Sequence, residues 1–517
     1  MNNFVTFLNL RLLYFLSINK KIDRYLYIFM FGILLFPSIS KAEGSKEIYI
    51  GGETHGLYFC NDFIGQCGGN GDRTQFAIYD CAESDRLYFE TLTDDEIVYM
   101  GFDGNPNNGW GTNYGIVYRI KRFDGSIALD QQNLPTSGAG FINSINEARV
   151  GPNQIYGVGG YDALVFAPGL AGTYYIEFQR VDNDQMGQPT EIGNFSMDLF
   201  DITVANISDV AQPGRLHSKA WQFGWDPSNG KCSAKFFVYS NDSIITSLQL
   251  KDMDGRVWFL YCNQTGVGST GNFELDRKSV PLQQFYAPEY KIFLNEPDDN
   301  IFPPASTLGS IIGNVTGIAH CDDGSIDFLV EVDKTGNVEI ELSFDPPYVT
   351  RAVSAIVQNG VNTITWDGFD GTTPIPFAVP NNTNITFSVT YINGLTNLPL
   401  YDVERNINGF VIELVSPPGS TPLVFWDDLN ISGGTTNLVG CASTPDPSWS
   451  GCHDWNNNPS GDPFGDFNTI NTWWYSASQT TAPVNIVEER GPDLLSFIQA
   501  PQAYCAGESG VFISVVA

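Results

Sequence analysis

Short apolar runs separated by turn-forming residues dominate the chain after about residue 45. Runs such as RLYFETL, GTYYIEFQR and NVEIELSF are alternating or continuously apolar, and they are rich in β-branched and aromatic residues. Gly, Asn, Asp and Pro punctuate these runs about every 8–12 residues, whereas helical periodicity is almost absent. The pattern predicts an all-β fold of tandem β-sandwich modules, Ig-like and jelly-roll-like in type, after a signal peptide.

Breaks in this pattern predict the domain organisation. Turn-rich stretches, such as those near residues 212–214 and 416–422, mark the expected boundaries. The predicted units are a signal peptide at 1–42, a jelly-roll-like β-sandwich at 46–204, a second β-sandwich at 216–317, an Ig-like domain at 325–415, a Trp- and Asn-rich β segment at 423–478 and the start of a truncated Ig-like repeat at 492–517. Because one or two strands leave an unpaired edge, we expect the chain to be the N-terminal part of a longer protein or a truncated gene product.

The N-terminal region has the three-part pattern of a secretory signal. Basic residues that include Arg24 precede the apolar run 25–36, and Ser40 and Ala42 supply small side chains at the expected cleavage position. A membrane-spanning helix needs about 20 apolar residues, so this run is too short to be an anchor. The sequence therefore predicts export across the membrane, cleavage after Ala42, and a secreted or cell-surface protein that does not span the membrane afterwards.

Charge and cysteine content narrow the expected environment. The formal net charge is −32, which argues against nucleic-acid partners because phosphate binding needs clustered Lys and Arg. The chain holds nine cysteines and lacks the C-x2-C spacing of a zinc site. In an exported protein these are candidate disulfides. The predicted pairs are Cys60 or Cys81 with Cys67, Cys232 with Cys262, and Cys441 with Cys452, which leaves Cys321 and Cys505 without obvious partners.

The C-terminal part of the chain resembles known protein families. Residues 359–391, NGVNTITWDGFDGTTPIPFAVPNNTNITFSVTY, resemble the Ig-like domain of flagellar hook-capping proteins. With YINGLTNLPLYDVE, FNTINTWWYS and AYCAGESGVF, the region 325–517 looks like the large exported surface proteins of gliding Bacteroidetes. That resemblance implies repeated Ig-like modules, a role in gliding motility and export as type IX secretion cargo. The sorting domain of such proteins does not occur within 325–517, so the secretion route is implied by resemblance alone.

Acidic residues offer one candidate metal site. Asp182 and Asp184 lie in a predicted loop, and Asp198 and Asp201 follow on a late strand, which would gather hard oxygen ligands for calcium at a sandwich edge. The motif WDGFDG is interpreted as a turn that begins after a core-capping Trp366, with a calcium loop through Asp367 and Asp370 as the alternative. Three other acidic pairs are expected on solvated loop faces: Asp298 and Asp299, Asp322 and Asp323, and Asp427 and Asp428.

No catalytic signature emerges from the motifs. The four histidines, His55, His217, His320 and His453, are far apart and form no H-E-x-x-H pattern, and no G-x-S-x-G elbow occurs. We therefore predict a non-catalytic cell-surface or secreted protein that acts in adhesion, gliding or matrix contact, with a cell-surface protein or an extracellular glycan as partner.

Two alternatives remain open from the sequence. One is a carbohydrate-binding module in residues 46–204, because aromatic faces stack on sugar rings. The other is a secreted hydrolase with two facing carboxylates somewhere in residues 46–317. The tryptophans Trp110, Trp473 and Trp474 are either plugs of the apolar core or part of a sugar site.

Overall fold

The computed structural model describes most of the chain between residues 41 and 486. The described ranges are 41–48, 55–59, 75–103, 114–182, 195–225, 231–255, 257–270, 272–282, 287–320, 325–344, 350–370, 373–374, 385–456 and 464–486. Contacts divide the chain into two units, Met1–Lys41 and Ala42–Ala517, and the described helices and strands all belong to the second unit. The predicted signal peptide up to residue 40 and the predicted unit at 492–517 lie outside the described residues.

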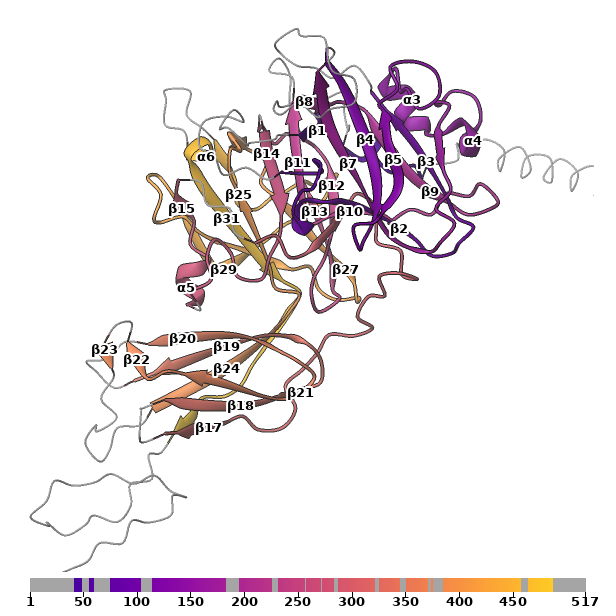
Figure 1. Cartoon of the computed structure of the whole chain (residues 1–517). Coiled ribbons are helices and arrows are strands. Elements are labelled where there is room, and N and C mark those ends of the chain that lie inside the picture. The colour runs from indigo at the N-terminus through magenta and orange to yellow at the C-terminus, as the bar shows by residue number, and fades with distance from the viewer. Residues whose placement is uncertain are drawn as a thin grey trace, which may run out of the picture. The chain divides into compact units, whose positions relative to one another are not determined.

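The largest sheet of the protein is antiparallel and draws strands from three of the predicted units (Figure 1). Alternating burial of side chains explains why its segments form strands. In KFFVY, residues 235–239, every second side chain is buried. Its nine strands follow the order β27 (Val411–Ser416), β13 (Ile245–Gln249), β12 (Lys235–Tyr239), β16 (Lys291–Phe293), β10 (Leu216–Ser218), β2 (Leu87–Thr91), β7 (Gly172–Asp182), β4 (Tyr114–Arg122) and β5 (Ile127–Asn133).

Smaller sheets join the nine-stranded sheet to form the larger part of the protein, which we call the body. They are β14 (Val257–Tyr261), β11 (Ala220–Trp225), β1 (His55–Phe59) and β8 (Phe195–Met197); β6 (Leu164–Phe166), β3 (Ile97–Phe102) and β9 (Phe200–Ala205); β15 (Val280–Pro281), β31 (Asn468–Tyr475), β28 (Leu423–Asp427) and β29 (Thr436–Ala442), with β25 (Thr396–Leu400) on β31; and the pair β26 (Arg405–Asn406) and β30 (Trp455–Asn456). One apolar core, from Ile48 to Trp474, joins them. Its large aromatic side chains, Trp221 and Trp258 among them, are fully buried.

A separate sandwich is formed by two further sheets with their own core. Strands β18 and β19 alternate strictly between buried and accessible positions, and Phe328, Ile340 and Trp366 meet between the sheets. The sheets consist of β17 (Thr316–Ala319), β18 (Ile326–Val332) and β21 (Gly360–Trp366), and of β20 (Arg351–Val357), β19 (Gly336–Ser343), β24 (Ile385–Asn393), β32 (Ala477–Thr480) and β33 (Val484–Ile486). A small hairpin, β22 (Phe369–Asp370) and β23 (Thr373–Pro374), follows β21.

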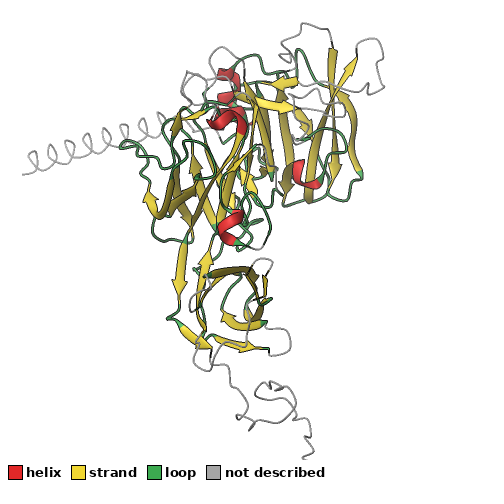
Figure 2. Ribbon diagram, turned by 90° about the vertical axis from the view of Figure 1, so that its left-hand side faces the viewer, coloured by secondary structure: helices red, strands yellow, loops and turns green. Residues whose placement is uncertain are grey.

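Helices contribute little to the described structure, as Figure 2 shows. They are α2 (Ser45–Ile48), the 3-10 turn η1 (Glu83–Asp85), α3 (Ile145–Val150), α4 (Asn153–Tyr156), α5 (Phe273–Asp276) and α6 (Phe464–Phe467). None of these described helices combines the length and the apolar character needed to cross a bilayer. The all-β prediction is therefore confirmed.

The hydrogen-bonded sheets cross the expected domain boundaries. Strand β1 pairs with β11 and β2 pairs with β10, so residues 46–204 and 216–317 share two sheets. Strand β27, expected within the Ig-like domain, instead pairs with β13, where Thr246 lies opposite Leu414. Conversely, β32, which begins at the end of the predicted Trp-rich segment, and β33 after it complete the sandwich by pairing with β24. Turn-rich stretches mark chain reversals, but backbone pairing across the sheets decides which strands belong together.

Candidate functional site

An aromatic-lined cavity of about 330 Å³ is the candidate binding site. Strands β28 and β31 are antiparallel neighbours with Phe425 opposite Trp473, which places both rings on one face of the sheet. The Phe425 ring stacks on Trp473 at 6.1 Å and on Tyr475 at 5.1 Å, each with an interplanar angle of 16°. All three aromatic residues line the cavity. The site therefore has an apolar wall built by cross-strand register.

Charged side chains from other elements line the same cavity. Arg277, which follows α5, lies with Nη2 2.8 Å from Glu339 Oε1 of β19, and Lys278 Nζ lies 3.7 Å from Asp427 Oδ2. Burial lowers the pKa of Arg277 and raises the pKa of Glu339. Arg277 and Glu339 also line a neighbouring cavity of about 240 Å³. An aromatic wall combined with acidic and basic hydrogen-bonding groups suits a small polar ligand with an apolar face, such as a sugar unit.

The two predicted tryptophans of β31 point to opposite faces of the sheet. Trp474 is fully buried in the main core, and its Nε1–H donates to Thr246 Oγ1 at 3.1 Å. Trp473 is 5% exposed and lines the cavity. The interpretation of both as buried side chains is confirmed, although Trp473 also contributes to the cavity wall. Trp110 lies outside the described residues. Phe425 and Tyr475 could not be predicted as cavity residues from the sequence, because only cross-strand pairing brings them together.

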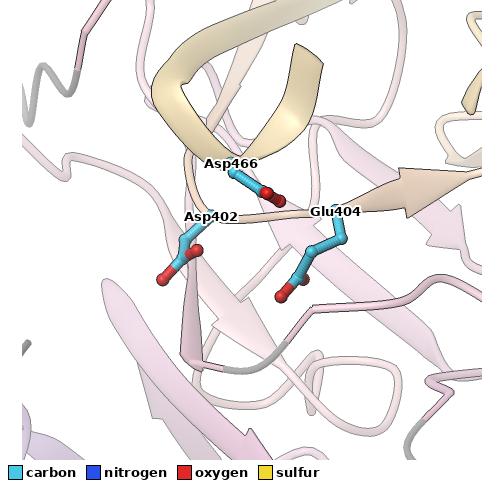
Figure 3. Close-up of side chains that lie close together, drawn as sticks. All are labelled: Asp402, Glu404 and Asp466. Atoms are coloured by element: carbon cyan, nitrogen blue, oxygen red, sulfur yellow. The ribbon is translucent and has the colours of Figure 1, made fainter. Parts of the chain in front are cut away.

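A second site gathers three carboxylates that no sequence motif indicates. Asp402 and Glu404 lie on the turn before β26, and Asp466 reaches toward them from α6 (Figure 3). Oxygens of the three groups lie within 4.8 Å of one another. Burial raises the pKa of Glu404 to about 7, and the charges of Asp402, Asp466 and Asp254 add to the effect. Calcium takes six or more oxygen ligands, and these three carboxylates supply only part of such a set.

The predicted calcium residues lie on different elements. Asp182 ends β7, Asp184 is outside the described residues, and Asp198 lies between β8 and β9. Asp201 is buried on β9, where it accepts a hydrogen bond from the Thr203 hydroxyl, and burial raises its pKa well above the ordinary value. No described group of three acidic side chains includes Asp198 or Asp201. The calcium site stays a prediction, and an identical melting midpoint with calcium and with chelator would contradict it.

The acidic motif at Asp427 and Asp428 is buried, so the expectation of a solvated loop face is wrong there. The Asp428 carboxylate lies 2.9 Å from His453 Nε2, and the other ring nitrogen, Nδ1, lies 2.7 Å from Thr472 Oγ1. Ser279 Oγ donates a hydrogen bond to the same carboxylate, and Trp426 stacks on the imidazole at 4.7 Å. This order of acid, imidazole and hydroxyl resembles a catalytic relay. Because all of these polar groups are buried or nearly so, we interpret the network as structural.

The two other described histidines also pair with carboxylates. His217 Nε2 lies 3.1 Å from Glu90 in the interior, and burial lowers the pKa of this imidazole. His320 Nε2 lies 2.9 Å from Asp327 on the sandwich, where both side chains are partly exposed. Among the described residues no histidine joins a group of three metal-ligating side chains.

Two further expectations concern Trp366 and the acidic pair Asp298 and Asp299. Trp366 is buried in the sandwich core, and Gly368 after it has a positive φ of 83°, so the interpretation is confirmed for the core-capping Trp366 and the turn at Gly368. Asp370 lies in β22 instead, and Gly371 lies outside the described residues. Asp298 differs from expectation, because its carboxylate binds the buried Arg215 guanidinium at 2.8 Å.

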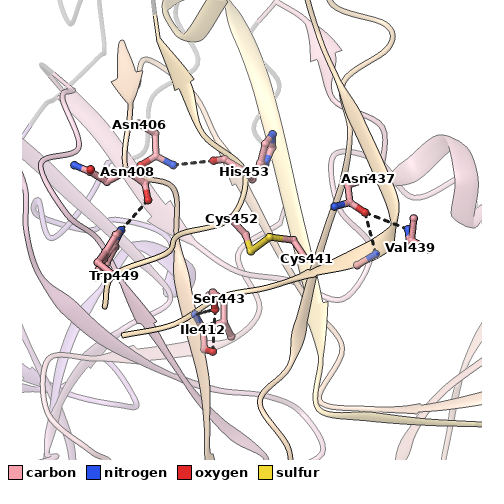
Figure 4. The surroundings of a disulfide bond; sticks show 11 residues. Asn406, Asn408, Ile412, Asn437, Val439, Cys441, Ser443, Trp449, Cys452 and His453 are labelled. Carbon is pink, nitrogen blue, oxygen red and sulfur yellow. Dashed lines mark hydrogen bonds between the residues drawn. A yellow bond between two sulfur atoms is a disulfide. The ribbon is translucent and has the colours of Figure 1, made fainter. Parts of the chain in front are cut away.

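One predicted disulfide is present and another is not. Cys441 and Cys452 are bonded, which ties β29 to the segment beside His453 (Figure 4). The predicted pair of Cys232 and Cys262 is wrong: Cys262 carries a free thiol at the end of β14, and Cys232 precedes β12 in a different sheet. Cys81 is also a buried free thiol, which contradicts its pairing with Cys67. The remaining cysteines, Cys60, Cys67, Cys321 and Cys505, lie outside the described residues.

Comparisons with known proteins add little. No family model matches the chain, and no curated protein matches it. Among solved structures, the chain is similar to a DUF4785 family protein from Legionella pneumophila, with 10% sequence identity, coverage of 62% of this chain and 81% of that one, and a TM-score of 0.13. A TM-score this low carries no argument about fold or function.

Proposed function

We propose that the protein is exported and acts outside the cell as a non-catalytic surface or secreted protein in adhesion, gliding or matrix contact. The signal pattern ending at Ala42 supports export, and the resemblance of residues 325–517 to surface proteins of gliding Bacteroidetes supports a type IX route and a surface role. The Cys441–Cys452 disulfide is the observation that supports the proposal most, because such bonds persist in oxidising compartments and are rare in the cytosol.

Fractionation of cells that express the natural gene tests the location. We expect the protein in the medium or exposed on intact cells, where added protease reaches it, with a mature N-terminus at Glu43 and with Cys441 bonded to Cys452. A full-length chain confined to the cytoplasm with reduced cysteines would contradict the proposal.

A deletion strain tests the role. We expect weaker attachment to, or slower gliding on, a solid surface, with recovery when the gene is restored. Unchanged attachment and unchanged gliding would contradict a contact function.

Glycan binding in the aromatic cavity is the second candidate function. It is favoured by the stacked wall of Phe425, Trp473 and Tyr475 together with the charged side chains of Arg277 and Lys278 that line the same cavity. A stacked pair of aromatic rings contributes about 0.5–1.5 kcal/mol beyond its buried area, and a gain of that size on a sugar face means that Tyr475→Ala should weaken binding roughly tenfold.

The test is a glycan array followed by calorimetry with the strongest binder. Trp449→Ala is the matched control, because Trp449 is an aromatic residue that bonds to Asn408 O near the disulfide and does not line the cavity. Equal loss in both variants, or no glycan retained by the natural protein, would exclude the cavity as a glycan site.

A further inference from the structure

The cavity of about 330 Å³ and the neighbouring cavity of about 240 Å³ lie along one face of the sandwich. Glu339 of β19 lines both of them. In the sheet register, Glu339 lies opposite Ser354 of β20 on one side and opposite Thr390 of β24 on the other. Ser354 lines the smaller cavity and Thr390 lines the larger one. Because directly opposite residues point to the same face of a sheet, this row of three side chains leads from one cavity to the other.

The next row on the same face repeats this arrangement. Asn337 lies opposite Ile356 of β20 and opposite Ile392 of β24. Ile356 and Asn337 line the smaller cavity, and Ile392 lines the larger one. Neighbouring strands are about 4.8 Å apart, so each row spans roughly 10 Å from β20 to β24. The two cavities are therefore adjacent along the sheet, at a separation that matches the length of a disaccharide.

The body supplies the rest of the wall of both cavities. Residues between Gln264 and Arg277 line the smaller cavity, and the stacked aromatic wall described above lines the larger one. Arg277 lines both cavities and lies 2.8 Å from Glu339, so one ion pair stands where the two cavities meet. A ligand that occupied both cavities would contact this ion pair and would touch the body and the sandwich together.

Two hydroxyl groups of the smaller cavity lack hydrogen-bond partners. Thr265 Oγ1 of the body and Ser354 Oγ of the sandwich are buried atoms that line this cavity, and neither has a partner among the described residues. Leaving a buried polar atom without a partner is unfavourable. A sugar hydroxyl both donates and accepts a hydrogen bond, and it therefore suits both groups. Ile356 and Leu395 add apolar surface for the carbon face of a sugar ring.

The charges around the two cavities disfavour an anionic ligand. Both cationic groups lie beside acids, Arg277 beside Glu339 at 2.8 Å and Lys278 beside Asp427 at 3.7 Å. Two further acids line the cavities, Glu274 the larger one and Asp276 the smaller one. Because the acids outnumber the cations, a negatively charged ligand would meet net repulsion, whereas an uncharged one would not.

We propose that the two cavities are adjacent subsites for an uncharged oligosaccharide of at least two sugar units, which binds across the seam between the body and the sandwich. The inference rests on the proposed glycan site and extends it from the aromatic cavity to the cavity beside Ser354. One unit stacks on the wall that contains Tyr475. The next unit bonds to the hydroxyl groups of Thr265 and Ser354, and the Arg277–Glu339 pair contacts the linkage between the two units.

Calorimetry with defined sugars tests the number of subsites and the class of ligand. The probes are cellobiose, maltose and N,N′-diacetylchitobiose, their units glucose and N-acetylglucosamine, and digalacturonate as an anionic disaccharide. We expect one uncharged disaccharide to bind more than about tenfold more tightly than its unit, and digalacturonate to bind more weakly than that disaccharide. Equal affinity for the disaccharide and its unit, tighter binding of digalacturonate, or no binding of any uncharged disaccharide would overturn the inference.

Variants at the two cavities separate this inference from the glycan site itself. Ser354→Ala should weaken binding of the disaccharide about fivefold and leave its unit unaffected, because it removes a hydrogen bond from the smaller cavity alone. Tyr475→Ala should weaken both. Ser343→Ala is the matched control, because Ser343 lies on β19 of the same sandwich and lines neither cavity. A loss with Tyr475→Ala but not with Ser354→Ala would overturn the second subsite while the glycan site stands, and no loss with either would overturn both.

Hydrogen exchange locates the second sugar unit without any substitution. The disaccharide should slow exchange in β20 and in residues 264–270 as well as in β28 and β31, because it rests on both cavities. The unit sugar should slow exchange in β28 and β31 only. The same pattern of protection with the disaccharide and with its unit would overturn the second subsite.

Discussion

The body and the sandwich are both β-structures, but they use buried polar groups differently. The described sandwich core consists of apolar side chains such as Phe328, Ile340 and Trp366. The buried polar residues among its described strands and adjoining turns are Ser325, Asn393 and Ser476. The body also encloses ionisable groups, among them Arg215 and the Asp428–His453 pair. Alternation of buried and accessible side chains along each strand is sufficient to build a small two-sheet core. A body assembled from several sheets relies in addition on ionic networks at the seams between its elements.

The largest effect should come from breaking one of these networks. The Arg215 side chain is 1% exposed and binds Asp298 at 2.8 Å and Glu96 at 3.3 Å. Arg215→Ala leaves both acids uncompensated and should cost about 3–5 kcal/mol of unfolding free energy. Lys219→Ala is the control, because Lys219 pairs with Glu83 near the surface and should cost about 0–1 kcal/mol. Urea denaturation measures both, and similar losses would show that the body does not depend on its buried ions.

The next effect should come from the covalent link in the body. Replacing both Cys441 and Cys452 by Ala removes a disulfide between residues 11 positions apart. The change should lower the free energy of unfolding by about 2–3 kcal/mol, chiefly because the unfolded chain gains conformational entropy. Cys262→Ala, at a buried free thiol, should cost about 1 kcal/mol from lost packing. Denaturation of the non-reduced proteins gives both values. If the double replacement costs no more than the single one, the disulfide does not stabilise the body.

A conservative change in the sandwich should have a smaller effect. Ile340→Val removes one methylene group from a fully buried position of β19 and should cost about 0.5–1.5 kcal/mol. Glu341→Gln is the control, because Glu341 is exposed on the same strand. Hydrogen exchange should show faster opening within residues 326–366 and unchanged protection of β11 and β12. Faster exchange throughout the body would indicate that the two cores unfold as one.

The last expected effect depends on pH and concerns the carboxylate cluster of Asp402, Glu404 and Asp466. The pKa of Glu404 is raised from an ordinary value of 4.5 to about 7, mainly by burial. The folded state therefore binds a proton more tightly than the unfolded chain, and this stabilisation is present below about pH 4.5 and is lost as the pH rises through about 7. Glu404→Gln cannot titrate and should melt higher than the natural protein at pH 8, with the gap closing toward pH 4.5. Asp446→Asn is an exposed control, and a gap that does not vary with pH would contradict the shift.

The amino-acid pattern by itself determined the strands and the class of fold. The alternation in residues 326–332 and 336–343 predicts which side chains are buried, because successive side chains of a strand point to opposite faces. The pairing of Cys441 with Cys452 was also predictable, since the two are close in sequence. Cys232 and Cys262 show the limit of that reasoning, because sequence separation does not say which sheet a residue joins.

Only the tertiary structure decided how the strands are shared and which polar residues are buried. Pairing of β13 with β27 joins segments more than 160 residues apart, and no local pattern encodes that register. Asp428 appears as one more acid in an acidic chain until His453, Ser279 and Thr472 are placed around it. The cavity wall of Phe425, Trp473 and Tyr475 likewise exists only through cross-strand contact. Periodicity is a local property that the backbone imposes, whereas the partner of a buried charge or ring depends on contacts between distant segments.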